Sequence, residues 1–322
     1  MKIVSLFAGC GGLDLGLHKA GHEIVHASDF DKDSVDTYNG YFKNKAKLID
    51  VHHLKGKDLP DYDLLAGGFP CQGFSVANIY RSKDDSRNQL YTQIVRLLKE
   101  SKPKFFLLEN VAGILSLEKG QVVEQIVKDL TNVNKIALGG YEVRYIKLNA
   151  ADYGVPQNRI RVIFLGISKS FDQNTRETMF KYFPPTPTHI SKGDMINTKY
   201  LTLRDVISDL GDPDKNYPIP NHVCNKHKVK ITGYIGNRKL DWDKPSPTIV
   251  GRGGGTGGPV IAVHPNLKRR FSVRESARIQ TFPDDFVFKG PISSQFRQIG
   301  NAVAVRFAEH LGHMLKKIEK QI

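Results

Sequence analysis

Short apolar segments alternate with longer amphipathic segments over the first 182 residues of this chain. Apolar segments of this length suit strands that are buried on both faces of a sheet. Seven parallel strands are predicted, at residues 2–7, 23–28, 46–49, 64–67, 105–108, 142–149 and 161–167. Helices are predicted between them at residues 13–20, 32–41, 90–101 and 121–132. This alternation predicts an α/β fold with a doubly wound, mostly parallel sheet.

The composition changes at the proline-rich residues 183–188, where helices and sheet ladders are both disfavoured. Residues 183–272 are rich in Pro, Gly and Asn, and they carry 14 Lys and Arg against 7 Asp and Glu. Six glycines fall within residues 251–258, which predicts a flexible or close-approach loop. Helical patterning returns after Ser272 and ends in a predicted helix at 302–317. We therefore expect a large domain of residues 1–182 plus 273–322 and a smaller, loop-rich domain of residues 183–272.

The chain is basic, with 47 Lys and Arg against 33 Asp and Glu and a net charge of +14. A nucleic-acid partner would explain this excess, because neutralising phosphates releases counterions; a solvated basic surface is the simpler alternative. Three cysteines are too few for a disulfide framework and suit a reducing cytoplasm. No segment is long and apolar enough to span a bilayer, and the apolar N-terminus is expected to form a buried strand rather than a removed leader.

Five successive predicted strands are followed by residues that can bind ligands or react, and such strand ends meet at one edge of a parallel sheet. These residues are the glycine-rich turn at 7–12 (FAGCGG), Asp29 with Phe30, Asp50, Cys71, and Glu109. A purely structural protein has no need for this concentration of reactive groups. The edge is therefore the predicted functional site.

The first three of these groups favour an adenosine-containing cofactor without phosphates. The glycine-rich turn lets a ligand approach the backbone, but Asp14 stands where a dinucleotide fingerprint requires its last glycine. Asp29 suits a ribose diol, which donates two hydrogen bonds to one carboxylate. Phe30 offers a flat face to a purine, and Asp50 can accept a hydrogen bond from an adenine amino group. The alternative is that both aspartates only cap the helices that follow.

Cys71 is the predicted nucleophile. Pro70 stiffens the backbone before it, and Arg81, Lys83 and Arg87 make the following segment electropositive. Such surroundings lower the pKa of a thiol toward a usable thiolate. The alternative, typical of free cysteines, is a small buried apolar residue.

The other two cysteines have no comparable setting. Cys10 lies in the glycine-rich turn, and Cys224 lies between His222 and His227. Those three donors lack an evident fourth ligand for zinc, so we expect no metal.

Glu109 ends an apolar strand, and partial desolvation there favours a carboxyl group that holds or shares a proton. Its alternative role is a helix cap. Arg159 and Arg161 are two residues apart, so on a strand they share one face. Two guanidinium groups on one face could grip a base oxygen and a phosphate, or could form salt bridges on an edge strand.

Together and in this order, these segments resemble the C5-cytosine DNA methyltransferases of bacterial restriction–modification systems. The resemblance covers residues 3 to about 310 and rests on six ordered motifs. They lie at residues 7–12 (FAGCGG), 68–72 (GFPCQ), 109–111 (ENV), 157–161 (QNRIR), 274–284 (RESARIQTFPD) and 298–303 (QIGNAV). In this family the variable target-recognition segment falls where residues 183–272 lie in this chain.

The resemblance implies that Cys71 is the nucleophile and that Glu109 hydrogen-bonds or protonates the cytosine at N3. It implies that Arg161 contacts O2 of the base, with support from Arg159. S-adenosylmethionine is the implied cofactor. The implied cofactor-binding residues are Phe7, Gly9, Gly11, Gly12, Leu13, Asp29, Phe30, Asp50, Val51, Pro70, Asn301 and Ala302. Asp29 departs from the glutamate of many members, which shortens the reach to the ribose by one methylene group.

Double-stranded DNA is the implied partner, because the target base must leave the stack before its ring can react. We expect the polar residues 75–88 to close over the flipped base. The expected DNA contacts are Ser75, Arg81, Arg87, Arg238, Lys239, Arg252 and Thr256. The expected target is a short palindrome of roughly four to six base pairs. The chain is expected to be monomeric and cytoplasmic, associated with the bacterial nucleoid, and to be paired in function with a restriction endonuclease.

Three other classes of protein are compatible with parts of the sequence. A tRNA cytosine methyltransferase has a similar architecture, but residues 70–75 read PCQGFS where that relative resembles PCQPFT. A non-catalytic DNA-binding module would explain the charge, but not Cys71 and Glu109. An adenine-N6 methyltransferase would carry an (Asp/Asn)-Pro-Pro-aromatic motif after the fourth strand, which residues 69–71 are not.

Overall fold

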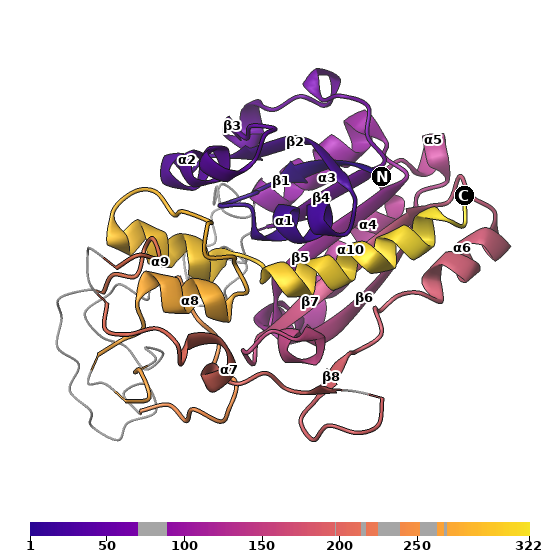
Figure 1. The fold of residues 1–322 in the computed structure, drawn as a ribbon. Helices are drawn as coiled ribbons and strands as arrows, with labels where there is room; N and C mark the ends of the chain where they lie inside the picture. The colour runs from indigo at the N-terminus through magenta and orange to yellow at the C-terminus, as the bar shows by residue number, and fades with distance from the viewer. Residues whose placement is uncertain (70–88, 197, 214–216, 225–238, 252–262, 267–268) are drawn as a thin grey trace.

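The computed structural model describes residues 1–69, 89–196, 198–213, 217–224, 239–251, 263–266 and 269–322. A seven-stranded sheet in the order β3-β2-β1-β4-β5-β7-β6 forms its centre (Figure 1). Its strands are β1 (Lys2–Leu6), β2 (Glu23–Asp29), β3 (Lys47–Leu48), β4 (Leu64–Gly68), β5 (Phe105–Val111), β6 (Tyr141–Asn149) and β7 (Ile160–Ser168). The doubly wound, mostly parallel sheet is thus confirmed.

The direction of β7 corrects the expectation that all seven strands are parallel. It lies between β5 and β6 and pairs antiparallel with both. Only residues 150–159 separate β6 from β7, and a parallel crossover needs a dozen or more residues. The short connection therefore forces the reversal.

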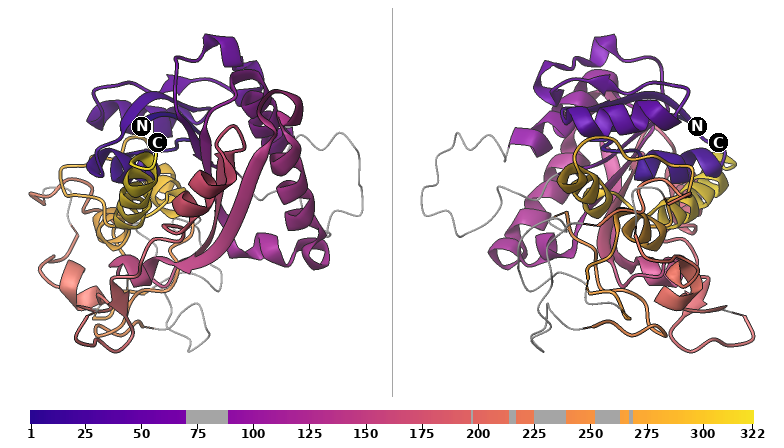
Figure 2. Two further views of the ribbon diagram at one scale, coloured as in Figure 1. Left: turned by 90° about the vertical axis from the view of Figure 1, so that its right-hand side faces the viewer. Right: turned by 60° about the vertical axis from the view of Figure 1, so that its left-hand side comes forward.

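Alternation along the strands supplies an apolar core on each face of the sheet. In β1, Ile3 faces one core and Val4 the other. The helices that pack on the first face include α1 (Gly12–Lys19), α2 (Lys32–Tyr41), α6 (Gln173–Phe180) and α10 (Val305–Glu319). The second face is covered by α3 (Gln89–Ser101) and α4 (Gln121–Asn132), and Figure 2 shows these two layers on either side of the sheet.

The last helix returns to the beginning of the fold. A Cβ added at Gly16 of α1 would lie 2.4 Å from the Cβ of Ala308 in α10, so these helices pack in close contact. The N-terminal ammonium group of Met1 pairs with Glu319, which places the two termini side by side (Figure 1). The predicted final helix at 302–317 is observed at α10, two to three residues later at each end.

A third core joins the segment 183–272 to the helices that follow it. It holds Leu203 and Ile207 of α7 (Leu203–Ile207), together with residues of α8 (Val273–Ile279) and α9 (Ile292–Asn301). Ser272 and Glu275 form a capping box that starts α8, where helical patterning was predicted to return. Besides short 3-10 helices, the structure describes one more α-helix, α5 (Lys135–Leu138), and a small parallel pair, β8 (His189–Ile190) with β9 (Thr198–Lys199). Over the described residues, no helix has the length and apolar character needed to cross a membrane.

Candidate active site

The glycine-rich turn after β1 is built to bring backbone close to a ligand. Phe7 and Gly9 adopt positive φ angles of 53° and 55°, and such strain in a non-glycine residue is concentrated at functional sites. A Cβ on Gly12 would lie 2.3 Å from the carbonyl oxygen of Val303, so only glycine fits there. This contact brings the segment after α9 against the turn.

Asp29, at the end of β2, is held by this turn. Its Oδ2 accepts a hydrogen bond from the Gly9 backbone N–H at 2.8 Å, and its Oδ1 accepts one from the Asp31 N–H at 2.9 Å. Burial raises the pKa of Asp29 above its usual value. Asp31, rather than Asp29, caps α2 through the Ser34 N–H, so the capping alternative does not account for Asp29. Each oxygen of Asp29 retains a lone pair for a further donor.

Next to Asp29, the ring of Phe30 is 69% exposed although it is large and apolar. Phe7, Asp29, Phe30 and Asp50 line one cavity of about 230 Å³. Asp50 also caps the short 3-10 helix Val51–His53, and hydrogen bonds from His52 lower the pKa of Asp50. Asp50 therefore caps this 3-10 helix, as the capping alternative predicted, and still presents an exposed carboxylate to the cavity.

Glu109 and Arg161 form an ion pair at the ends of β5 and β7. The distance from Arg161 Nε to Glu109 Oε1 is 2.6 Å, and the two side chains are 9% and 13% exposed. Gly68 makes room for this carboxylate, because a Cβ there would lie 2.9 Å from Glu109 Oε2. The Asn110 side chain donates to the Phe69 carbonyl at 3.0 Å, within the motif at residues 68–72.

Arg159 differs from its neighbour Arg161, because backbone carbonyls take up its guanidinium group. Its Nη1 donates to Ile249 O and its Nη2 to Gly300 O and Ala302 O, each at 2.9 Å. Burial lowers the pKa of Arg159 to about 9, which leaves it charged at neutral pH. These bonds tie Ile249, in the segment 183–272, to the C-terminal end of α9.

A single cavity of about 360 Å³ joins the glycine-rich turn to the Glu109–Arg161 pair. Of the predicted residues, it is lined by Phe7, Gly9, Gly12, Leu13, Asp29, Phe30, Glu109, Arg159, Arg161, Asn301 and Ala302. Gly68 and Phe69, which lead toward Cys71, also line it. Three arginines also line this cavity, but Arg161 is paired with Glu109, Arg159 with backbone carbonyls and Arg297 with Asp31. The remaining carboxylate acceptors, exposed ring and backbone turn fit a nucleoside cofactor that lacks phosphates.

Several predicted residues lie elsewhere. Asp50 and Val51 line the smaller cavity, which shares Phe7, Asp29 and Phe30 with the larger one. Gly11 caps α1 beneath the Tyr38 and Phe42 rings instead of lining either cavity. Lys239 is exposed, and its backbone forms an isolated parallel β-bridge with Val263. Outside the described residues lie Pro70, Cys71, Ser75, Arg81, Arg87, Arg238, Arg252, Thr256 and the whole segment 75–88 that is expected to close over the base.

The two cysteines that the structure describes are poor nucleophiles. Burial raises the pKa of the Cys10 thiol to about 12 and that of the Cys224 thiol to about 11. His222 bonds to Gly211 O and to the Ser272 hydroxyl, while His227 lies outside the described residues. Neither thiol therefore competes with Cys71 as the expected nucleophile.

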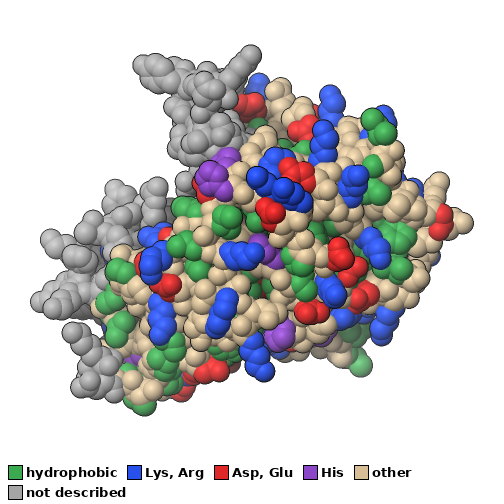
Figure 3. Space-filling view, turned by 90° about the horizontal axis from the view of Figure 1, so that it is seen from above, with side chains coloured by type: hydrophobic (Ala, Val, Ile, Leu, Met, Phe, Trp, Pro, Cys, Tyr) green, Lys and Arg blue, Asp and Glu red, His purple; other side chains and the backbone are tan. Residues whose placement is uncertain are grey.

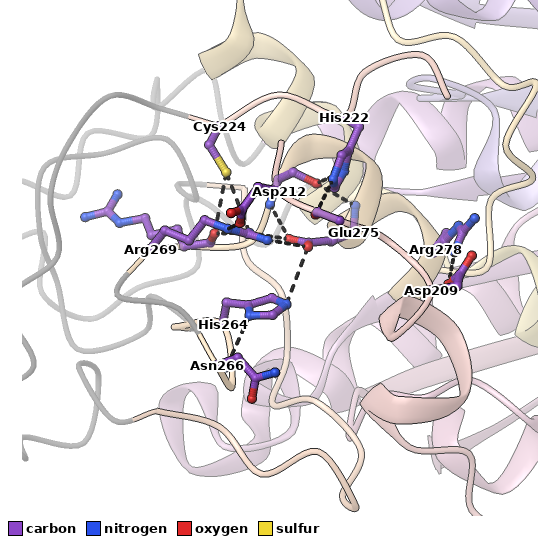
Figure 4. A network of polar contacts seen from close by, with 12 residues as sticks. Asp209, Asp212, His222, Cys224, His264, Asn266, Arg269, Glu275 and Arg278 are labelled. Carbon is purple, nitrogen blue, oxygen red and sulfur yellow. Dashed lines mark hydrogen bonds and ion pairs between the residues drawn. The ribbon is translucent and has the colours of Figure 1, made fainter. Parts of the chain in front are cut away.

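The motif at residues 274–284 stabilises the contact between α8 and the segment 183–272. Glu275 is fully buried, caps α8 and receives Arg269 Nη1 at 2.8 Å (Figure 4). Arg269 also donates to the sulfur of Cys224 at 3.8 Å. Arg278 joins Asp209 and Asp284 at 2.6 and 2.7 Å. This network fastens part of the segment 183–272 to α8.

Gln157 positions neighbouring segments, a role that the sequence did not predict. Its amide accepts from the Ile249 N–H at 2.9 Å and donates to Gln280 at 3.1 Å, and Gln280 in turn donates to Ile299 O. The only sequence signal was its place in the motif at 157–161. A buried glutamine with both ends bonded across long sequence separations cannot be inferred from spacing.

The doubly wound sheet, with a cavity at the carboxyl ends of its strands, is the fold of DNA methyltransferases. The chain belongs to the C-5 cytosine-specific DNA methylase family, whose model matches residues 1–317. It is a DNA (cytosine-5-)-methyltransferase, and S-adenosylmethionine is its methyl donor.

Full-length relatives support this assignment. The chain is 36% identical to the type II methyltransferase M.FnuDI of Fusobacterium nucleatum, over 100% of this chain and 98% of that protein. It is 36% identical to the type II methyltransferase M.NgoFVII of Neisseria gonorrhoeae, over 94% of this chain and 83% of that protein.

Solved structures share the fold. A putative DNA modification methyltransferase encoded within an E. coli prophage matches with a TM-score of 0.70 and 26% identity, covering 99% of both chains. The Dnmt2 methyltransferase of S. pombe matches with a TM-score of 0.67 at 17% identity, covering 98% of both chains, which shows the fold alone.

Proposed function

We propose that this enzyme methylates C5 of a cytosine flipped out of a short, specific duplex DNA sequence, through a covalent bond between Cys71 and C6 of the base. We further propose that the modification protects DNA from a cognate restriction endonuclease. The type II methyltransferases among its relatives support this second part. The expected setting is the bacterial cytoplasm, on the nucleoid, with the enzyme acting as a monomer.

The proposed chemistry starts from the low nucleophilicity of cytosine C5. Addition of the Cys71 thiolate at C6 converts the ring to an enamine with electron density at C5. Glu109 hydrogen-bonds or protonates N3, which neutralises charge that develops on addition. Arg161, which pairs with the Glu109 carboxylate at 2.6 Å, would contact O2 of the same base. Once C5 carries the transferred methyl group, loss of the C5 proton and β-elimination of the thiolate release Cys71 and restore the aromatic ring.

The donor is proposed to lie across the two connected cavities. Asp29 would accept hydrogen bonds from the ribose hydroxyls, Asp50 would accept one from the adenine amino group, and Phe30 would cover the purine face. The segment at Asn301 and Ala302 would close the methionine end. When bound there, S-adenosylmethionine supplies an electrophilic methyl group.

DNA recognition is assigned to the proposed domain 183–272 and to the loop at 75–88. Arg238, Lys239, Arg252 and Thr256 are the proposed contacts in the first, and Ser75, Arg81 and Arg87 in the second. Figure 3 shows Lys and Arg side chains spread over the upper face with acidic side chains among them, so the described part of this face carries no purely basic patch. The basic excess of residues 183–272 therefore makes that segment the better partner for DNA phosphates.

The observation that carries the proposal is the single cavity shared by the glycine-rich turn, Phe69 and the Glu109–Arg161 pair. Bisulfite sequencing of DNA from a host that expresses the chain tests it. The expected result is 5-methylcytosine at one position of one short sequence. Methyl incorporation into tRNA but not duplex DNA would contradict it.

A further inference from the structure

The cavity proposed for the purine contains a histidine that the function above leaves without a role. His52 lines it together with Phe30, Ile49, Asp50 and Leu90. This residue lies in the short 3-10 helix that Asp50 caps. Its ring is therefore fixed next to the carboxylate expected to meet the purine amino group.

His52 holds one oxygen of Asp50 twice. Asp50 Oδ1 accepts the His52 backbone N–H at 2.9 Å and lies 2.7 Å from the His52 ring Nδ1. An ionised carboxylate only accepts hydrogen bonds, so Nδ1 carries the proton in this contact. Within the part of the chain that the structure describes, no hydrogen bond reaches the other oxygen, Oδ2.

The two hydrogen bonds to Oδ1 matter because the Asp50 side chain is 51% exposed and would otherwise rotate. With Oδ1 occupied from two directions, Oδ2 is left as a fixed acceptor. The other ring nitrogen of His52, Nε2, is buried and has no hydrogen-bond partner among the described residues, so the ring is oriented by its Nδ1 contact with Asp50.

We propose that His52 is a positioning residue that makes the cofactor site selective for a 6-aminopurine over a 6-oxopurine. It holds the Asp50 carboxylate so that Oδ2 meets the amino group. A 6-oxopurine presents an acceptor there, which repels Oδ2 and leaves it unpaired. This inference rests on the proposed cofactor position.

The test uses calorimetric binding of two ligands to the full chain: S-adenosylhomocysteine and its 6-oxo analogue, S-inosylhomocysteine. Wild type should prefer the adenosyl ligand. His52→Ala should weaken that ligand roughly three- to ten-fold, because Asp50 must then be ordered on binding, and should leave the inosyl ligand unchanged. His52→Asn, which can donate from its amide, should recover most of the lost affinity.

Two controls separate selectivity from general damage. His53→Ala changes the exposed next residue and should alter neither affinity. In an Asp50→Ala background, His52→Ala should have no further effect, because the two residues act through one interaction. Thermal unfolding of each variant verifies that it is folded.

The outcomes distinguish failure of the proposed role of His52 from failure of the proposed cofactor position. Equal weakening of both ligands by His52→Ala, or no weakening of either, overturns the role of His52 while the cofactor position stands. Failure of wild type to bind either ligand overturns the proposed cofactor position and this inference with it.

Discussion

Arg161 and Glu109 are diagonal neighbours across the antiparallel pair β5–β7, with Arg161 Nε 2.6 Å from Glu109 Oε1. Register explains the contact, because Arg161 is paired with Val111 and Glu109 with Ile163. Side chains at such diagonal positions share one face of the sheet. The reversal of β7 thus brings the motifs at 109–111 and 157–161 into contact.

Substitution of either partner should slow the chemical step. Glu109→Gln keeps the shape but removes the acid, and we expect the single-turnover methylation rate to fall about 10²–10⁴-fold. Arg161→Ala should slow it as well, since Glu109 loses its partner in a largely buried cavity. Arg161→Lys should recover only part of the rate, because lysine keeps the charge without the planar guanidinium group. An Arg161→Ala enzyme with the wild-type rate would contradict the paired role.

Gly68→Ala tests whether the position of Glu109 matters beyond its presence. The added Cβ would lie 2.9 Å from Glu109 Oε2, so the carboxylate must move. We expect the single-turnover rate to fall roughly ten- to hundred-fold. Gly113→Ala is the matched control, because no atom of the described residues lies within 4 Å of a Cβ there. Equal rates for the two variants would show that Glu109 tolerates displacement.

Arg159 should contribute mainly to stability. Arg159→Lys keeps the charge but cannot reach three backbone carbonyls with one planar group. We expect a loss of about 2–4 kcal/mol in the free energy of unfolding, measured by urea denaturation. Arg204→Lys, at an exposed ion pair with Asp243, should change stability little. A similar small change for Arg159→Lys would argue against its bracing role.

Strand positions and the grouping of strand-end residues could be predicted, because apolar segments are local and parallel strands place their carboxyl ends together. Arg159 and Arg161 show the limit. Spacing predicts a shared face for both, yet Arg159 donates to the carbonyls of residues 249, 300 and 302, whereas Arg161 pairs with Glu109. That distinction depends on contacts between segments far apart in the sequence. The direction of β7 likewise depended on the length of one connection.

Asp14 should make stability depend on pH. Burial raises the pKa of its carboxyl group to about 6, although Ser5 and Tyr38 donate hydrogen bonds to it. Because this pKa lies above the unfolded value of 3.8, the folded protein holds the proton more tightly. The stabilisation is complete below about pH 4 and is lost as the pH rises through about 6.

Asp14→Asn should remove this dependence. Relative to the variant, wild type should lose about 2–3 kcal/mol of unfolding free energy between about pH 4 and about pH 7. Burial also lowers the pKa values of His22 and His26 to about 4. Comparing the two proteins at each pH cancels the contribution of these histidines to the pH dependence of stability. Parallel stability curves for the two proteins would exclude a titrating Asp14.

The role of Cys71 is tested most directly with a duplex that carries 5-fluorocytosine at the methylated position. After methyl transfer, fluorine cannot leave C5 as a proton does, so β-elimination is blocked and the enzyme stays attached. With S-adenosylmethionine present, wild type should form a denaturation-resistant adduct that peptide mapping assigns to Cys71, and Cys71→Ser should form none. Absence of an adduct with wild type, or an equal yield from Cys71→Ser, would contradict covalent catalysis by this residue.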